Sequence, residues 1–384
     1  MYSLILYDTS NFIDFPIGGQ LTSIRNFLRY VAEVHQDKCN EILLVGVTTN
    51  KLEIGKIKEI NISNRKFKFL SVLYRDTNLS KIQTSMRIEY LKALFRFRKL
   101  IPSGKNVLHY LHTPEAFIQI KLCHPFSKIA IFSHGSFFNM VAGFRFYKNN
   151  KLIEKSFNIF LCWMLKKADI IFALDKASKE QYLKYNKNIV SVENSIVLPQ
   201  GIMKREKCHN PIKLLFVGRL SKVKRVDTII KAISLIKGKA ELTVLGDGEE
   251  KNYLQRIIKE NKLENYVHLI GAVSPIEVQK YMKENDILIM NSILEGKPMT
   301  ILEAMSYGMP IITTNVGGIS DLVINSKNAI FTNGTIEEIL EAVTVIKKEY
   351  SFFSLEAIKG SRKYDYRIIN KNIYNVLSKK INHI

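Results

Sequence analysis

Short apolar runs alternate with helical patterns from one end of this chain to the other. Short apolar runs bounded by glycine, proline or polar residues are typical of buried strands. The stretches between them carry apolar residues three or four positions apart, which is typical of amphipathic helices. Strands that are joined through helices pair in parallel, because a parallel crossover needs a dozen residues or more. The sequence therefore predicts an α/β protein with doubly wound parallel sheets.

The chain has 384 residues, which is enough for two domains, and its 46% hydrophobic content allows each a core. Residues 194–210 lack periodicity and include Pro199 and Gly201, as a linker would. We therefore predict an N-terminal domain over 1–193, a linker over 194–210 and a second domain over 211–364. The last residues, 365–384, are predicted to form a helix that crosses back to the first domain.

The chain is strongly basic, with 57 Lys+Arg against 35 Asp+Glu and a net charge of +22. Such a charge suits nucleic acid, anionic lipid or phosphorylated substrates, and the alternative is general solubility. A nucleic-acid-binding protein would need a known motif or interleaved aromatic and basic residues. The sequence offers neither, so no nucleic-acid partner is expected.

The four cysteines are scattered without a C-x-x-C pair, so we expect no disulfide, no zinc site and a reducing compartment. No basic residues precede the first apolar run, which favours a strand over a signal peptide. The protein is expected to be cytoplasmic, with peripheral contact to the inner face of the cytoplasmic membrane. A basic helical pattern over 81–100 and an aromatic stretch over 137–147 favour that contact. The alternatives are a solvated helix face and ordinary core packing.

Residues 291–318 carry the strongest chemical signal. They read as the end of a strand, a loop, a short helix and a second strand, with Glu295 and Glu303 on either side of the helix start. A helix start offers free N–H groups to an anion. Carboxylates beside that anion would repel it, so they are better used to accept hydrogen bonds from hydroxyl groups of the same ligand. An anion with hydroxylated groups on both sides describes a nucleotide sugar.

A second loop carries several cations. The predicted strand 212–217 is followed by Gly218, Arg219 and Lys224, and then by a helical pattern. A glycine, cations and a helix start after a strand can bind a diphosphate. The alternative is an ordinary surface loop at a helix start.

In the first domain, Gly18 and Gly19 stand between a predicted strand and a predicted helix, where glycines let a backbone approach a ligand. His112 and His134 follow two further predicted strands. Open α/β sheets bind ligands at the carboxyl ends of their strands, so both histidines are candidates. His134, which precedes a glycine, is the better one; the alternative for either is a polar residue that bonds backbone.

Taken together, residues 213–322 resemble the C-terminal domain of the retaining GT-B glycosyltransferases, the "glycosyltransferase group 1" clan. The resemblance rests on the E-x7-E element from Glu295 to Glu303 and on the loop from Gly218 to Lys224. The first half resembles the clan in layout more than in identity. The resemblance implies a GT-B fold, with two doubly wound Rossmann-like domains facing each other across a cleft.

The resemblance also implies roles for single residues. It places the transferred sugar at Glu295 and His134, and the ribose at Glu303. The residues that it implies for the donor diphosphate are Arg219, Lys224, Gly19 and the backbone of Met299, Thr300, Ile301 and Leu302. No metal and no cofactor are expected.

Four points stay open at this stage. Gln20 stands where the clan has a small residue, and Ser195 stands where it often has glycine. Arg225 replaces a glycine that commonly follows the loop lysine, so it either adds a cation near the phosphates or points outward. Thr300 and Glu303 also fit a capping box, in which Glu303 would only satisfy a backbone N–H.

The implied function is retaining transfer of a hexose-type sugar from a nucleoside diphosphate sugar, with UDP-sugar favoured. The expected acceptor is a hydroxyl of a saccharide linked to polyprenyl diphosphate, in capsule, O-antigen or exopolysaccharide synthesis. The alternatives are a nucleotide-sugar epimerase or hydrolase that acts without an acceptor, and a non-catalytic partner subunit. Glu295→Ala is expected to abolish transfer with little loss of stability.

Overall fold

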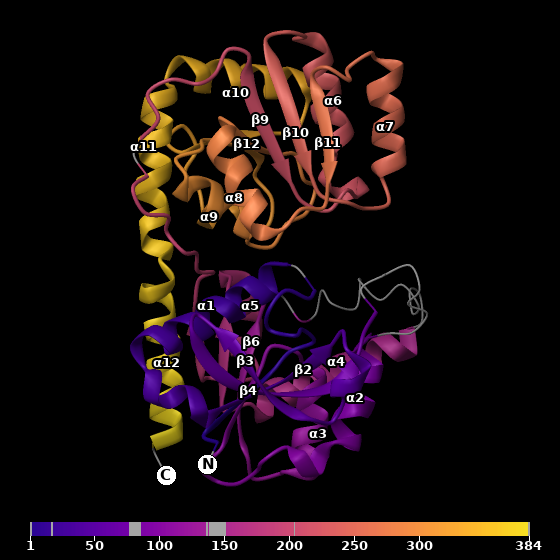
Figure 1. Ribbon diagram of the computed structural model, residues 1–384, viewed down its shortest axis with the longest axis vertical. Helices are drawn as coiled ribbons and strands as arrows, with labels where there is room; N and C mark the ends of the chain where they lie inside the picture. The colour runs from indigo at the N-terminus through magenta and orange to yellow at the C-terminus, as the bar shows by residue number, and fades with distance from the viewer. Residues whose placement is uncertain are drawn as a thin grey trace. The chain divides into compact units, whose positions relative to one another are not determined.

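The computed structural model describes residues 2–16, 18–76, 86–135, 137, 151–202 and 204–382 (Figure 1). The chain divides into two compact units. The first comprises Met1–Ser195 together with Tyr366–Ile384, and the second comprises Ile196–Asp365. Residues 196–210, which the sequence suggested as linker, thus belong to the second unit.

The first unit contains an eight-stranded sheet in the order β3-β4-β2-β1-β5-β6-β7-β8. All neighbours pair in parallel except β3 and β4, which form an antiparallel hairpin. Its strands are β1 (Leu4–Tyr7), β2 (Ile42–Thr48), β3 (Ile57–Ile62), β4 (Arg65–Tyr74), β5 (Leu108–Leu111), β6 (Lys128–Ser133), β7 (Ile170–Ala173) and β8 (Ile189–Ser191).

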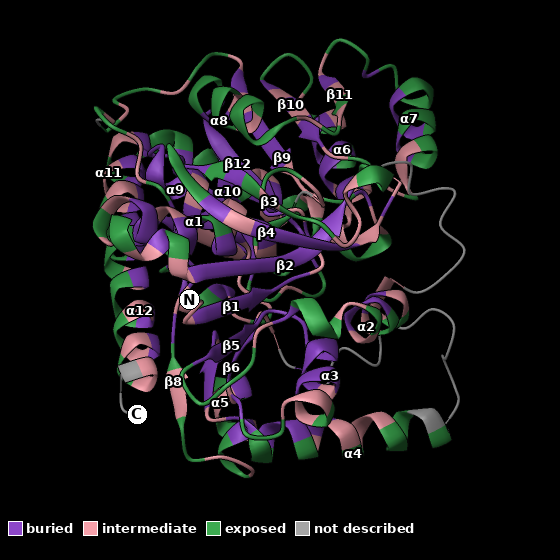
Figure 2. Ribbon diagram, turned by 60° about the horizontal axis from the view of Figure 1, so that its bottom comes forward, coloured by how far each residue is buried: buried purple, intermediate pink, exposed green. Residues whose placement is uncertain are grey.

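Helices cover both faces of this sheet, and the central strands are buried along their length (Figure 2). Alternate residues of β1 show this directly, because Leu4 and Leu6 pack into one apolar cluster and Ile5 and Tyr7 into another. A strand buried on both faces reads as a continuous apolar run. The described helices of this unit are α1 (Gly19–Val34), α2 (Met86–Arg96), α3 (Glu115–Cys123), α4 (Lys151–Lys167), α5 (Lys176–Leu183) and α12 (Tyr366–Asn382).

The second unit contains a six-stranded parallel sheet in the order β11-β10-β9-β12-β13-β14. Its strands are β9 (Ile212–Val217), β10 (Ala240–Leu245), β11 (Val267–Gly271), β12 (Ile287–Met290), β13 (Ile311–Thr314) and β14 (Ala329–Thr332). Its helices are α6 (Val226–Leu235), α7 (Lys251–Glu260), α8 (Pro275–Glu284), α9 (Met299–Ser306), α10 (Ile336–Lys348) and α11 (Tyr350–Ser361).

The final helix α12 packs within the first unit. Its Tyr366, Ile373 and Leu377 join the apolar cluster that also holds residues of α1. The Tyr366 hydroxyl donates to Glu33 of α1, which also pairs with Arg29 at 3.0 Å. Where the chain enters and leaves the second unit, Ile196 N–H donates to the carbonyl of Tyr364 at 2.9 Å.

The predicted α/β class with two doubly wound parallel sheets is confirmed. The sequence did not predict β3, α3 or α11. Strand β3 alternates polar and apolar residues weakly, and its hairpin turn uses Ser63 and Asn64 at positive φ instead of glycine. Of the helix expected over 81–100, the described part contains α2 and a short 3₁₀ turn, Arg98–Leu100; residues 81–85 lie outside the described part.

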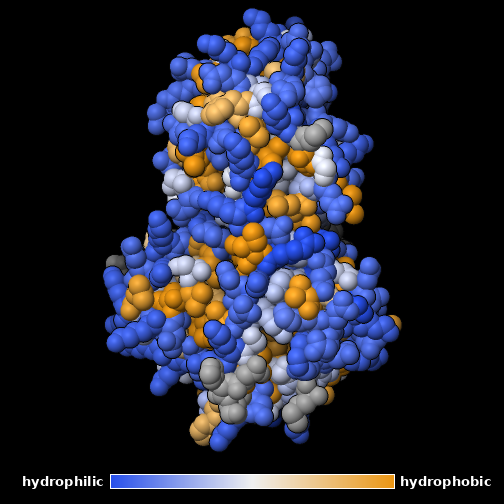
Figure 3. All heavy atoms as spheres, turned by 90° about the vertical axis from the view of Figure 1, so that its left-hand side faces the viewer, coloured by the Kyte–Doolittle hydropathy of each residue, from blue (hydrophilic) through white to orange (hydrophobic). Residues whose placement is uncertain are grey.

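None of the helices described here is both long and apolar enough to cross a bilayer. The face of the molecule in Figure 3 is mostly hydrophilic, with hydrophobic residues in small separate patches. That surface fits the net charge of +22.

Candidate active site

Two neighbouring strands of the second unit, β9 and β12, hold the residues that the sequence singled out. Because these strands are parallel and adjacent, the loops that follow them leave the same edge of the sheet. The loops touch through backbone as well, since Ile293 N–H donates to the carbonyl of Val223 at 2.8 Å. The cation loop and the E-x7-E loop are therefore one structural site.

Lys224 and Glu295 form the central contact of this site. Lys224 Nζ lies 2.5 Å from Glu295 Oε1, and the two side chains are only 19% and 8% exposed. The Ser292 hydroxyl donates to the same carboxylate oxygen at 2.6 Å. The second oxygen of Glu295 and two of the three Lys224 N–H donors have no partner among the described residues, so both groups keep capacity for a ligand.

Arg225 neither points outward nor adds a free cation, the two roles left open from its sequence. Its backbone is left-handed, at φ 47°, and it forms the N-cap of α6. Its guanidinium donates to the Asn291 carbonyl at 2.8 Å, and it packs so closely on Gly334 that a β-carbon there would lie 2.1 Å away. A left-handed position favours glycine, which is the residue that the resemblance led us to expect there. Arg225 thus joins the starts of α6 and α10 to the end of β12.

Helix α9 begins directly after this loop. Its N-cap is Pro298, no side chain caps its first turn and no acidic residue lies there. The N–H groups of Met299, Thr300, Ile301 and Leu302 lie at the positive end of the helix dipole without a competing carboxylate in the first turn, and that of Ile301 also donates to the Pro298 carbonyl at 3.3 Å. This is the arrangement that binds an anion. The alternative of a capping box between Thr300 and Glu303 is wrong, because the N-cap is Pro298 and Thr300 already lies inside the helix.

Gly317 allows the Glu295 loop to pack against the backbone that follows β13. A β-carbon at Gly317 would lie 1.8 Å from the carbonyl oxygen of Glu295, and its φ of 59° is left-handed. Gly318 N–H donates to the Gly296 carbonyl at 2.9 Å. Only glycine therefore fits here, and the pair of glycines after β13 fixes where Glu295 stands.

Glu303 is half-buried on α9, and its carboxyl has no hydrogen-bond partner among the described residues. Desolvation raises the pKa of Glu303 to about 7. A buried carboxyl without partners costs free energy in the ligand-free protein. Hydroxyl groups of a ligand would remove that cost, which fits the role implied for it.

Arg219 stands apart from the Lys224–Glu295 pair. Its side chain is 65% exposed and pairs with Glu249 at 3.1 Å. The backbone around it is fixed, because the N–H groups of Gly218 and Leu220 donate to the carbonyls of Leu245, at the end of β10, and Asp247, in the loop that follows, at 3.0 Å each. Arg219 is therefore an exposed side chain on a rigid loop, free to turn toward a ligand.

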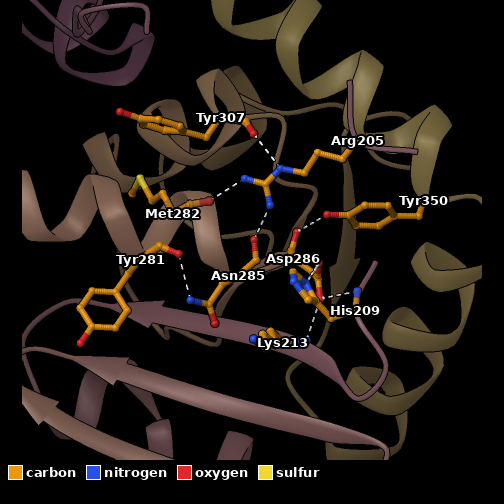
Figure 4. Close-up of polar contacts among 9 residues, drawn as sticks. All are labelled: Arg205, His209, Lys213, Tyr281, Met282, Asn285, Asp286, Tyr307 and Tyr350. Carbon is orange, nitrogen blue, oxygen red and sulfur yellow. Dashed lines mark hydrogen bonds and ion pairs between the residues drawn. The ribbon is translucent and has the colours of Figure 1, made fainter. Parts of the chain in front are cut away.

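Arg205 is a residue that the sequence analysis missed (Figure 4). Its guanidinium donates to the carbonyls of Tyr307 at 3.0 Å and Met282 at 2.6 Å, and to that of Asn285. Tyr307 and Asn285 are the C-caps of α9 and α8. One cation thus satisfies the ends of two helices, including the helix that carries Glu303. The only signal in the sequence was a charged run in the expected linker.

Asp286 anchors the other side of this region, at the start of β12 (Figure 4). It is 1% exposed and accepts from the backbone N–H groups of Lys213 at 2.8 Å and His209 at 3.1 Å. Its carbonyl accepts from the Tyr350 hydroxyl at 3.1 Å. These contacts fix the register of β12 beside β9, on which the meeting of the two loops depends.

The first unit has a site of its own at the carboxyl ends of β1, β5 and β6. A cavity of about 240 Å³ opens there. Both histidines of the sequence analysis line it, together with Gln20, Arg87 and Thr113. Phe137, the described residue of the aromatic stretch, also lines the cavity and stacks on Tyr182; residues 138–147 lie outside the described part.

The two histidines bond to each other. Nδ1 of His112 lies 2.8 Å from Nε2 of His134. Desolvation lowers the pKa of His134 to about 3 and holds the pKa of His112 well below its usual range, so both rings are neutral. The sequence placed both residues at strand ends but did not predict that they pair.

Gln20 closes the first loop. Its amide donates to Asp8 and to the carbonyl of His112, at 3.2 Å in the second case. Asp8 is buried, and desolvation raises its pKa to about 6. Gly19 is the first residue of α1, whose N-cap Gly18 offers no side chain. The start of α1 is therefore open, and Gln20 has a structural use that a small residue would not serve.

Comparison with known proteins finds a family and a fold for this chain. Residues 202–359 match the model of the family described as "Glycosyl transferases group 1". The crystal structure of Anabaena Alr3699/HepE in complex with UDP superposes with a TM-score of 0.70 and 16% identity, over 99% of this chain and 100% of that one. The fold is that of a GT-B glycosyltransferase.

Two relatives are named for the synthesis of amylovoran and of lipopolysaccharide. The amylovoran biosynthesis glycosyltransferase AmsK of Erwinia amylovora is 31% identical over 128 residues, which is 31% of each chain. The lipopolysaccharide 1,6-galactosyltransferase of Salmonella typhimurium is 28% identical over 224 residues, covering 56% of this chain and 62% of that protein. The match to the family over residues 202–359 and the GT-B fold are therefore found in the same chain as the site described above.

Proposed function

We propose that this protein is a retaining glycosyltransferase that moves a hexose-type sugar from a nucleoside diphosphate sugar to a saccharide hydroxyl. The observation that carries the proposal is the buried Lys224–Glu295 pair beside the uncapped start of α9. A cation, a carboxylate with an open oxygen and the N–H groups of a helix start match a sugar joined to a diphosphate. A UDP-sugar is favoured, because HepE binds UDP.

Each half of the donor has proposed partners. Arg219, the open donors of Lys224 and the N–H groups at the start of α9 bind the diphosphate. The carboxyl of Glu303 accepts from the ribose hydroxyls, and the open oxygen of Glu295 accepts from a hydroxyl of the sugar. In the first unit, we assign contact with the transferred sugar to His134 and contact with the phosphates to Gly19.

The reaction breaks the bond between the sugar carbon and the diphosphate oxygen, and forms one to the acceptor oxygen on the same face. Negative charge develops on the leaving diphosphate, where Lys224, Arg219 and the α9 dipole stabilise it without a metal. The acceptor proton passes to the leaving phosphate oxygen. Neutral His134 positions the sugar and does not act as a base.

We further propose that the acceptor is a polyprenyl-diphosphate-linked saccharide, in capsule, O-antigen or exopolysaccharide synthesis. The relatives that act in amylovoran and lipopolysaccharide synthesis support this acceptor class. Helix α4 supports a membrane surface as its location, because Leu152, Ile159 and Trp163 are 77%, 62% and 38% exposed among basic neighbours such as Lys155 and Lys166. Exposed apolar and basic residues on one helix suit an anionic bilayer.

A donor screen tests the proposal. The protein is incubated with UDP-glucose, UDP-galactose and UDP-N-acetylglucosamine and a polyprenyl-linked saccharide extract, and UDP release and sugar transfer are both measured. We expect transfer that Glu295→Gln abolishes. Consumption of the donor without an acceptor would instead favour an epimerase or hydrolase. Failure of every donor to bind, by folded wild-type protein, would refute the proposal.

A further inference from the structure

His112, which is buried, and His134, which is partly exposed, share one hydrogen bond, and each ring has a second nitrogen outside that bond. His112 is 6% exposed, and its Nε2 is buried without a partner among the described residues. Leaving such a nitrogen unpaired costs free energy unless a ligand supplies the missing hydrogen bond. Because His112 lines the cavity, the cavity is where that ligand would bind.

The shared proton couples the outer nitrogens of the two rings. A neutral imidazole carries one N–H and one lone pair. If Nδ1 of His112 holds the shared proton, Nε2 of His112 is an acceptor and Nδ1 of His134 is a donor. If Nε2 of His134 holds the shared proton, Nε2 of His112 is the donor and Nδ1 of His134 is the acceptor. The pair therefore always presents one donor and one acceptor, and His112 fixes which nitrogen of His134 is which.

The ligand that suits such a pair is a neutral hydroxyl group, which both donates and accepts. A phosphate or carboxylate would need a cation, and burial keeps both rings uncharged. Arg87, a cation among the residues that line the cavity, already pairs with Glu115 at 3.2 Å. The chemistry of the cavity thus selects a polyol over an anion.

His112 is held rigidly enough to act in this way. Its backbone N–H donates to the Tyr7 carbonyl at 3.0 Å, and its carbonyl accepts from Gln20. Its ring stacks on Phe132 at 5.1 Å and meets the edge of Tyr110 at 4.6 Å. The ring therefore has little freedom to turn away from His134.

We propose that His112 and His134 form one neutral unit that binds a hydroxyl of the substrate saccharide in this cavity. His112 is the positioning residue of the unit, because it sets the tautomer of His134. The inference rests on the proposed glycosyl transfer and adds to it the group that the first unit recognises. That hydroxyl belongs either to the donor sugar or to the acceptor.

Three variants of the full-length protein test the inference. His112→Phe keeps the ring stacking but leaves His134 without its partner, and His112→Asn restores a polar group near the position of Nδ1. His109→Phe is the matched control, because His109 is also buried on β5 and bonds Tyr7 at 2.8 Å, outside the cavity lining. Thermal unfolding of each variant shows how far it remains folded.

We expect His112→Phe to lower the transfer rate roughly 10- to 100-fold, since it leaves a buried polar group unpaired where the substrate binds. His112→Asn should recover most of that loss, and His109→Phe should cost stability with little change in rate. Equal rate losses in His112→Phe and His109→Phe, or no recovery in His112→Asn, would reduce His112 to a structural role and overturn the inference.

Monodeoxy analogues locate the hydroxyl. We expect one analogue, of the active UDP-hexose or of the acceptor saccharide, to be transferred or glycosylated more slowly than the parent compound by the wild type but not by His112→Phe. A double-mutant cycle that combines the deoxy change with the substitution measures this coupling. If every analogue lost the same fraction of the transfer rate in the wild type and in His112→Phe, the histidine pair would not bind a hydroxyl.

Nitrogen-15 spectra of the histidines give a readout that does not need activity. The wild type should show His112 and His134 both neutral at pH 7, with a His134 tautomer that changes in His112→Phe. An unchanged tautomer would refute the coupling even if transfer were absent. Wild-type protein that transfers no sugar, yet shows the coupled tautomers, would instead contradict the proposed function alone.

Discussion

Replacing Glu303 by glutamine should stabilise the protein and weaken nucleotide binding at the same time. The pKa of Glu303 is raised from 4.5 to about 7 by desolvation. The folded protein therefore holds this proton more tightly than the unfolded chain does. Its contribution to stability is fully present below pH 4.5, declines as pH rises toward 7 and is lost above it.

The size of the effect follows from the shift. A difference of about 2.5 pKa units, at about 1.36 kcal/mol per unit, costs the folded wild type roughly 3 kcal/mol above pH 7. Glutamine is neutral at every pH and avoids that cost. In urea unfolding, Glu303→Gln should exceed the wild type by roughly 3 kcal/mol at pH 8 and by less than about 1 kcal/mol at pH 5.

The same substitution should loosen UDP roughly 10-fold or more at pH 8 in calorimetry, because hydrogen bonds from ribose hydroxyls to a charged carboxylate are lost. Glu264→Gln, at an exposed position on the same unit, is the control and should change neither quantity. If Glu303→Gln is no more stable at pH 8, the account of its burial is wrong. If it binds UDP as the wild type does, its role in ribose binding is wrong.

Three further predictions concern the same unit. Lys224→Met should lower the free energy of unfolding by roughly 3–5 kcal/mol, because it leaves Glu295 buried and unpaired; the double variant Lys224→Met/Glu295→Leu should recover most of that loss but stay inactive in the donor screen. Arg205→Met should lower the free energy of unfolding in urea by about 3 kcal/mol, because three carbonyls at the ends of α8 and α9 lose a charged donor. Wild-type stability in this variant would show that Arg205 does not hold the two helix ends. Gly317→Ala should displace the Glu295 loop and lower transfer at least 10-fold while UDP still binds, and unchanged transfer would show that the loop position does not matter.

The sequence predicted the layers of this fold because local signals determine them. Apolar runs marked the central strands of both sheets, and the E-x7-E element fell on the loop after β12 and on α9, as expected. The strand order is a different matter, since which strands lie side by side depends on the whole chain. The adjacency of β9 and β12 brings Lys224 to Glu295 across 71 residues, which no local pattern could indicate.

That pairing also changes an expectation drawn from the sequence alone. Glu295→Ala was expected to abolish transfer with little loss of stability, as for an exposed loop carboxylate. Glu295 is instead 8% exposed and bonded to Lys224, so its removal leaves a largely buried cation unpaired. We now expect Glu295→Ala to cost stability as well, which is why the double variant is the better test.

The first unit shows the same limit. His112 and His134 were each assigned to the end of a strand, and the carboxyl ends of β5 and β6 do place them at one cavity. Their mutual hydrogen bond depends on side-chain geometry that strand patterns do not specify. The contacts of Arg205 could not be predicted either, because its partners are backbone carbonyls, which every residue carries.

The most direct test of the central claim is transfer of labelled sugar by wild-type protein and by Glu295→Gln, measured side by side with UDP binding. The account predicts that the wild type links a hexose from a UDP-sugar to a saccharide acceptor with retained anomeric configuration. It predicts that Glu295→Gln still folds and binds UDP but transfers nothing. Transfer by folded Glu295→Gln at the wild-type rate, or a product of inverted configuration, would contradict it.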